Sequence, residues 1–143
     1  MFIGEHEHNI DDKGRLAMPA RFRVAFADGL VMTRGLDGCL FIYTKNDWAE
    51  LAEKLVEMPI SQAGARQFAR HMLAGAMDAE LDKQGRVVVP SYLRQFAKLE
   101  STVVIAGLYN RIEVWNKQNW SEQQKQAESK SDEIAQSLLD FGI

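Results

Sequence analysis

Cysteine is almost missing from this 143-residue chain, which carries a single one, Cys39. A lone thiol cannot form an intramolecular disulfide, and it belongs to no spacing that is typical of a zinc site. Long hydrophobic runs are missing too, because no apolar stretch approaches the roughly 20 residues that cross a bilayer. Residues 1–8 also lack the basic start and long apolar run of a signal peptide. We therefore expect a cytoplasmic protein without membrane segments.

The motifs of common enzyme classes are absent as well. The chain has no phosphate-binding Walker loop, no nucleophile elbow and no paired catalytic carboxylate motif. His6 and His8 share one face of an expected strand, but no carboxylate or cysteine motif completes a metal site around them. Cys39 has no His or Asp partner in sequence, so we expect a small buried hydrophobic residue rather than a nucleophile. The sequence predicts no enzyme activity, no metal, no cofactor and no small-molecule substrate.

An excess of positive charge is also lacking, since the formal net charge is -3. Residues 121–143 account for all of it, with two lysines against five acidic residues. Residues 1–120 are neutral overall, and two basic clusters lie within them, formed by Lys13, Arg15, Arg21 and Arg23 and by Lys83, Arg86, Arg94 and Lys98. The local field decides polyanion binding more than the net charge does. A nucleic-acid partner is therefore compatible with this composition.

The chain repeats itself. Residues 11–23 reappear as residues 82–94, with Asp, Gly, Arg, Pro and a second Arg at identical spacing and apolar residues between the first Arg and the Pro. The match extends outward to four further pairs: Gly4 and Gly75, Gly35 and Gly107, Tyr43 and Trp115, and Trp48 and Trp120. Two copies of one unit, each offering an arginine from a tight turn, indicate a protein that grips a repetitive, charged partner.

Each copy is predicted to run strand, turn, strand, short helix, strand, turn, strand and helix. The expected strands cover residues 2–10, 15–18, 30–33 and 40–43, then 77–81, 86–89, 102–106 and 111–115. Short helices should follow Pro19 and Pro90. A capped helix beginning after Thr44 and a helix over 61–76 should connect the copies, and the polar stretch 117–143 should be helical, with a new start at Ser131.

The repeated turn is the strongest functional signal. Asp11 and Asp82 can accept backbone hydrogen bonds, and Gly14 and Gly85 can supply a positive φ. Arg15 and Arg86 would then be guanidinium groups on rigid turns, suited to bidentate contacts with guanine edges or phosphate. The alternative is that each arginine forms an ion pair with its aspartate. Both can hold together.

Other recurring residues have plainer interpretations. The tryptophans Trp48 and Trp120 should anchor the helix of each copy to its sheet. Arg66 and Arg70 lie one helical turn apart, and we expect them on a solvated helix face, with an accessory phosphate contact as the alternative.

The duplicated turn, the Pro-led helix after it and the start Met1–Gly4 together resemble the MraZ family, bacterial regulators of the division and cell-wall gene cluster. The resemblance covers nearly the whole chain. It implies an α+β fold in which two tandem AbrB-like β-hairpin units form one pseudo-twofold β-barrel core with flanking helices. We expect residues 1–57 to form the first unit, 58–76 the connecting helix, 77–130 the second unit and 131–143 an acidic tail.

The same resemblance implies a nucleoid-associated homo-oligomeric ring that binds short tandem repeats in double-stranded DNA upstream of its own operon and represses transcription. By motif, the DNA-binding residues would be Lys13, Arg15, Lys83 and Arg86. The turn-fixing residues would be Asp11, Gly14, Asp82 and Gly85, and the accessory candidates are Arg21, Arg23 and Arg94. The competing hypothesis is a structural or protein-interaction scaffold, in which the turns only hold ion pairs and the acidic tail recruits a partner.

Overall fold

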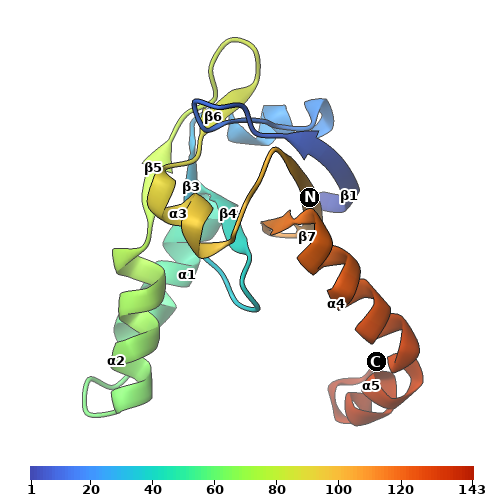
Figure 1. Ribbon diagram of the computed structural model, residues 1–143. Coiled ribbons are helices and arrows are strands. Elements are labelled where there is room, and N and C mark those ends of the chain that lie inside the picture. The colour runs from blue at the N-terminus through green and yellow to red at the C-terminus, as the bar shows by residue number, and fades with distance from the viewer.

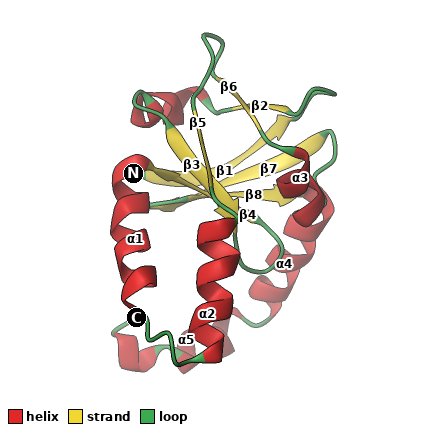
Figure 2. Ribbon diagram, turned by 90° about the vertical axis from the view of Figure 1, so that its left-hand side faces the viewer, coloured by secondary structure: helices red, strands yellow, loops and turns green.

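Two antiparallel β-sheets and several helices make up the chain, which the computed structural model describes over all 143 residues (Figures 1 and 2). The strands are β1 Phe2–Asn9, β2 Arg15–Ala17, β3 Leu30–Arg34, β4 Leu40–Thr44, β5 Met77–Ala79, β6 Arg86–Val88, β7 Thr102–Tyr109 and β8 Ile112–Asn116. The α-helices are α1 Lys45–Glu57, α2 Ala63–Ala69, α3 Ser91–Phe96, α4 Lys117–Ser129 and α5 Ser131–Ser137. Two 3₁₀ helices, η1 Ala20–Phe26 and η3 Leu139–Phe141, and a π-helical turn, η2 Arg70–Ala74, complete the chain. The expected α+β class is confirmed.

Local sequence signals place most elements correctly. The side chain of Thr44 accepts a hydrogen bond from the Asp47 N–H at 3.1 Å, and α1 ends at Glu57, just before Pro59. The helix predicted over residues 61–76 begins at Ala63 and widens into η2 at its end. The β3–β4 hairpin packs on this widened turn, where the Thr33 hydroxyl donates to the Met72 carbonyl at 2.6 Å.

The two halves of the chain exchange strands. The larger sheet has the order β1-β7-β8-β4-β3-β5, so β1 of the first half pairs along its whole length with β7 of the second. In return, β5 of the second half pairs with β3 of the first, and β2 pairs with β6 to form a separate two-stranded sheet, here called the ribbon. Neither half contains a complete sheet of its own.

The expected β-barrel is not closed, which corrects that part of the prediction. The larger sheet ends at β1 and β5, and these two edges do not pair with each other. The three-residue strand β5 leads almost at once into the turn before β6, so the chain leaves the sheet before it could reach β1. The ribbon lies across this end of the sheet instead (Figure 1), and Ile10, the residue after β1, forms an isolated bridge with Leu16 of β2.

The main core fills the space between the larger sheet, the ribbon and the two short helices. Leu16 and Val87 cover it from the inner face of the ribbon, and both are fully buried. Phe22 of η1 and Leu93 of α3 cover it at equivalent positions of the two halves. The core is therefore shared, as expected for two units with strands too short to bury enough surface alone.

A second core lies on the opposite face of the larger sheet, under α1, α2 and α4. The rings of Tyr43 and Trp48 are 5.8 Å apart, and those of Trp115 and Trp120 are 5.6 Å apart. The predicted anchoring role of the two tryptophans is confirmed. Cys39 lies in this core with its thiol donating to the Leu36 carbonyl, and burial raises its pKa, as expected of a small buried residue.

Two helical arms extend from the sheet on the side away from the ribbon. One arm consists of α1 and α2, and the other of α4 and α5; they stand on opposite sides of the molecule (Figure 1). Figure 2 shows the ribbon at one end and both arms at the other. None of the helices combines the length and the apolar composition needed to cross a membrane.

We predict that Leu16→Ala lowers the free energy of unfolding by about 2–5 kcal/mol, because it leaves a cavity under the ribbon where both halves meet. Chemical denaturation measures the loss. Val24→Ala is the matched control, since Val24 is exposed and its truncation should change stability by no more than about 0.5 kcal/mol. Equal effects of the two variants would contradict a core held together at the ribbon.

Candidate nucleic-acid interface

The first turn is fixed by one carboxylate. Asp11 Oδ1 accepts hydrogen bonds from the Lys13 N–H at 3.0 Å and the Arg15 N–H at 2.9 Å, while Asp11 Oδ2 accepts from Arg15 Nε at 2.6 Å. The Gly14 N–H donates to the Asp11 carbonyl, and Gly14 has a φ of 81°, which favours glycine. These hydrogen bonds hold the pKa of Asp11 below its ordinary value, with the bond from the Arg15 backbone contributing most.

The second turn repeats this network bond for bond. Asp82 Oδ1 accepts from the N–H groups of Gln84 and Arg86, both at 2.9 Å, and Asp82 Oδ2 accepts from Arg86 Nε at 2.9 Å. Gly85 has a φ of 77°. The pKa of Asp82 is lowered for the same reason, the Arg86 backbone bond first. Asp82 and Gly85 thus occupy the same places in the second turn as Asp11 and Gly14 in the first.

Both motif arginines form the ion pair that the alternative hypothesis proposes. Each uses only its Nε atom for the aspartate, however, and neither terminal Nη atom of Arg15 or Arg86 makes a hydrogen bond within the chain. The side chains remain 32% and 30% exposed. Each guanidinium is thus held by one edge while its other edge is free for a partner.

The register of the ribbon places both arginines on one face. Arg15 lies opposite Val88, Leu16 opposite Val87 and Ala17 opposite Arg86. Because side chains alternate along a strand, Leu16 and Val87 point into the core and the other four point outward. Cα atoms of such diagonal pairs are about 7–8 Å apart, so the two guanidinium groups flank a small apolar patch formed by Ala17 and Val88. The two turns lie at opposite ends of the ribbon, and Arg15 and Arg86 lie on its outward face, so the turns share one side of the molecule in this sense.

Arg94, one of the accessory candidates, braces the opposite half. Its Nε donates to the Val89 carbonyl at 2.9 Å, and the Val89 N–H donates to the Gly14 carbonyl at 2.8 Å. A Cβ added at Gly14 would lie 3.2 Å from the Arg94 guanidinium and 2.9 Å from the Val89 carbonyl. Gly14 is therefore required both by its φ and by this close approach.

Arg23, in the first half, braces the turn of the second half in the same way. Its Nε donates to the Met18 carbonyl at 3.0 Å, the Met18 N–H donates to the Gly85 carbonyl at 2.9 Å, and a Cβ at Gly85 would collide with the Arg23 guanidinium. The sequence analysis did not predict these crossed contacts. The signal available was the repeated spacing of four residues between Pro19 and Arg23 and between Pro90 and Arg94.

The remaining basic candidates surround the ribbon without bonds of their own. Lys13 and Lys83 are exposed at the two turns but occupy different corners, because Gln84 stands where the first turn has Lys13 and Asp12 where the second has Lys83. The Arg21 guanidinium lies 6.0 Å from the Phe22 ring centroid and is otherwise exposed. The structure thus brings the four predicted DNA-binding residues to one end of the molecule; their contacts with DNA stay a prediction.

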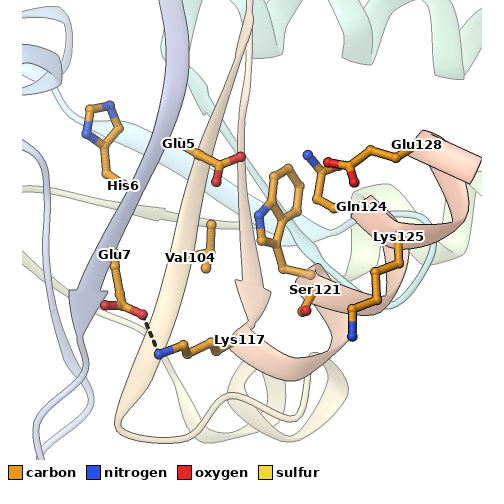
Figure 3. Close-up of a pocket in the computed structure, with 10 residues that line it drawn as sticks. Glu5, His6, Glu7, Val104, Lys117, Ser121, Gln124, Lys125 and Glu128 are labelled. Carbon is orange, nitrogen blue, oxygen red and sulfur yellow. Dashed lines mark ion pairs between the residues drawn. The ribbon is translucent and has the colours of Figure 1, made fainter. Parts of the chain in front are cut away.

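A pocket with a volume of about 640 Å³ lies elsewhere, between β1, β7 and α4 (Figure 3). Its lining is polar, and an ion pair of 2.7 Å between Lys117 Nζ and Glu7 Oε1 closes one side. In Figure 3, Glu5 and Glu7 point from β1 toward α4, while His6 points away from it. A smaller pocket beside α1 repeats this arrangement in the other half, with Lys45, Trp48 and Asp78 equivalent to Lys117, Trp120 and Glu7. A pocket that recurs wherever a helix follows its hairpin reflects the duplication rather than a specific ligand.

His6 packs against η1. The His6 and Phe22 rings are 5.2 Å apart in an edge-to-face arrangement, and His6 Nε2 is buried without a hydrogen-bond partner. Burial, followed by the charges of His6 and Arg23, lowers the pKa of His8. The structure contains no group of three or more His, Cys, Asp or Glu side chains placed to hold a metal ion.

Fold and site define a class: a duplicated α+β chain whose two halves exchange strands and present paired arginine turns on a shared ribbon. The sequence model of the family described as "MraZ protein, putative antitoxin-like" matches residues 1–71 and again residues 72–142. Proteins named "Transcriptional regulator MraZ" are similar over their full lengths. Those of Natranaerobius thermophilus and Heliobacterium modesticaldum are each 48% identical over 143 residues, covering 100% of both chains. That of Desulforamulus reducens is 45% identical over 141 residues, 99% of each chain. This chain belongs to the MraZ family.

We predict that Arg94→Ala destabilises the fold by about 1–3 kcal/mol, because the buried Val89 carbonyl loses a charge-assisted hydrogen bond. Thermal denaturation measures the effect. Arg21→Ala is the matched control, since it removes the same charge from an exposed side chain without a hydrogen bond. A melting temperature as high in Arg94→Ala as in Arg21→Ala would exclude the bracing role.

We also predict a pH dependence. Folding lowers the pKa values of Asp11 and Asp82, so the stability they contribute is complete above their ordinary pKa of about 4 and is lost as the pH falls through the folded-state values. The double variant Asp11→Asn, Asp82→Asn should therefore show a smaller loss of melting temperature than the original chain when the pH is lowered from 6 to about 3. Parallel curves for the two proteins would show that the carboxylate charges do not stabilise the turns.

Proposed function

We propose that this protein is a DNA-binding transcriptional regulator that reads double-stranded DNA with the outer face of its ribbon. Its relatives carry the name of transcriptional regulators, and the family resemblance extends the proposal to repression of the division and cell-wall gene cluster through short tandem G-containing repeats upstream of its own operon. The proposed contacts are made by Arg15 and Arg86, with Lys13 and Lys83 on the flanking phosphates.

The observation that carries this proposal is the pair of half-free guanidinium groups on one ribbon face. A two-stranded β-ribbon fits the major groove of B-DNA, and arginine makes bidentate contacts with the O6 and N7 atoms of guanine. Successive bases of one strand are about 3.4 Å apart. Arginine positions about 7–8 Å apart therefore correspond to about two base-pair steps. The two turns of one chain would thus read a single short site, and Ala17 and Val88 between them could contact thymine methyl groups.

The ion pairs with the aspartates support this function rather than compete with it. A flexible arginine loses side-chain entropy on binding, and an Nε atom already bonded to a carboxylate reduces that loss. The scaffold hypothesis explains the ion pairs equally well, but it gives no reason for placing both partly exposed arginines on the same outward face of the ribbon.

Self-association belongs to the same proposal. One chain offers four basic side chains to DNA, and each phosphate contact adds modest, salt-sensitive affinity. A ring of identical chains would present the same ribbon face several times, so tandem repeats in the DNA would be bound together with higher avidity. Such a ring would suit DNA that carries its short sites in series.

We predict that Arg15→Ala and Arg86→Ala each weaken binding to the upstream DNA by about 5- to 150-fold, which corresponds to about 1–3 kcal/mol for each lost guanine contact. Gel shifts across a range of salt concentrations measure the affinity. The double variant should bind the upstream DNA no more tightly than it binds unrelated DNA. Lys125→Ala is the charge-matched control, because Lys125 is exposed on α4, away from the ribbon.

Thermal melts of the same variants separate lost contacts from lost folding. If the double variant binds DNA as tightly as the original chain and both proteins melt normally, the ribbon face is not the DNA-binding site. Binding that is insensitive to salt in the original chain would likewise favour the scaffold hypothesis.

A further inference from the structure

The short helix α3 has three faces with three different partners. Leu93 packs into the main core, and Arg94 braces the first turn through the Val89 carbonyl. Tyr92 and Phe96, one helical turn apart, face the π-helical turn η2 and the residue that follows it. A helix of six residues has little stability of its own in water, so these contacts decide how it is oriented.

A directional hydrogen bond holds the third face. The Tyr92 hydroxyl donates to the Gly75 carbonyl at 2.8 Å, and the Arg34 guanidinium lies 5.8 Å from the centre of the Tyr92 ring. Phe96 adds an edge-to-face contact with His71, with ring centroids 5.6 Å apart. Apolar contacts in the core tolerate rotation of the helix about its axis, because the hydrophobic effect has no direction. The Tyr92 bond resists this rotation, since hydrogen bonds weaken steeply away from their preferred geometry.

The acceptor of this bond is itself fixed. A Cβ added at Gly75 would lie 2.6 Å from the His71 carbonyl and 2.9 Å from Arg34 Nη1, so a larger residue does not fit without moving its neighbours. Arg34 Nη1 also donates to the His71 carbonyl at 3.4 Å, and His71 Nε2 donates to the Gly35 carbonyl at 2.7 Å. Single π-helical turns are rare and are frequent at functional sites. This one is bonded to the β3–β4 hairpin, and its end presents a carbonyl at a defined place.

The first half of the chain has no equivalent bond. Arg21 occupies the position of Tyr92, and it is exposed and forms no hydrogen bond. η1 is held instead by two phenylalanines whose ring centroids each lie 5.2 Å from that of Phe2. Arg94, which braces the first turn, therefore belongs to a helix anchored on η2, whereas Arg23, which braces the second turn, does not.

We propose that Tyr92 is a positioning residue for Arg15. The Tyr92 bond fixes the rotation of α3, and with it the Arg94 side chain that donates to the Val89 carbonyl. The Val89 N–H in turn donates to the carbonyl of Gly14, in the turn that carries Arg15. Since α3 lies between the end of α2 and the ribbon (Figure 1), these contacts join the α1–α2 arm to the first turn and bypass the second. This inference rests on the proposed function, because it names what holds one of the two DNA-reading arginines in place.

Hydrogen–deuterium exchange of the full-length chain without DNA tests the positioning directly. Tyr92→Phe removes one hydroxyl and keeps the ring, so the variant should fold. Backbone amides of residues 11–15 should exchange about 2- to 30-fold faster, while those of residues 82–85 should keep their rates. Tyr109→Phe is the matched control, because Tyr109 is 67% exposed and lies on the β7–β8 hairpin; it should leave both turns unchanged. Unchanged exchange at the first turn in Tyr92→Phe, or equal acceleration at both turns, would overturn the inference.

Gel shifts with the upstream DNA test the consequence for binding. Tyr92→Phe should weaken binding about 2- to 30-fold in the original chain and in Arg86→Ala, where Arg15 still contacts the DNA. In Arg15→Ala the same change should have no effect, because the side chain that Tyr92 positions is missing. Low salt keeps the weakened complexes measurable. A residue that acts only through overall stability would weaken binding by one factor in all three backgrounds, and that result would contradict the positioning role.

The two measurements separate this inference from the proposed function. Unchanged exchange at the first turn in Tyr92→Phe, with DNA binding still weakened by Arg15→Ala, would overturn the inference and leave the proposed function in place. Faster exchange at the first turn, with DNA binding unaffected by Arg15→Ala, would keep Tyr92 as the residue that orders this turn and remove Arg15 from DNA binding.

Discussion

The antiparallel pairing of β2 with β6 is the interaction on which the rest of the molecule depends. It closes the main core through Leu16 and Val87, and it links the two repeated turns through backbone hydrogen bonds from Met18 to Gly85 and from Val89 to Gly14. Each turn is therefore completed by the other half of the chain. Because the exchange is reciprocal, stability of the fold and geometry of the arginine face are set by the same contacts.

This dependence explains why four arginines at two repeated positions have two different surroundings. Arg15 and Arg86 are bonded through Nε to the aspartate of their own turn and keep their Nη atoms free. Arg23 and Arg94 use Nε for the backbone carbonyl of Met18 or Val89, the residue just before the proline that precedes their helix, and they pack against the opposite glycine. The difference between the two pairs is what their guanidinium groups face: those of Arg23 and Arg94 lie against the opposite glycine, whereas those of Arg15 and Arg86 stay partly exposed on the outer face of the ribbon.

Charge is distributed along the molecule in a way that the net value hides. The acidic residues of 121–143 lie in the α4–α5 arm, at the end opposite the ribbon (Figure 1). Exposed charges separated by more than about 8–10 Å are largely screened at physiological ionic strength. The net charge of -3 therefore need not oppose a polyanion at the arginine face.

The sequence by itself determined the duplication, the turn chemistry and most element positions, because these depend on residues close together in the chain. Asp11, Gly14 and Arg15 form their network within five residues, and the cap at Thr44 spans four. Only the tertiary structure decided that β1 pairs with β7, that the sheet stays open and that Arg23 and Arg94 reach the opposite turns. Such contacts join residues far apart in the chain, and both a closed and an open arrangement would bury the same alternating apolar residues, so local periodicity could not distinguish them.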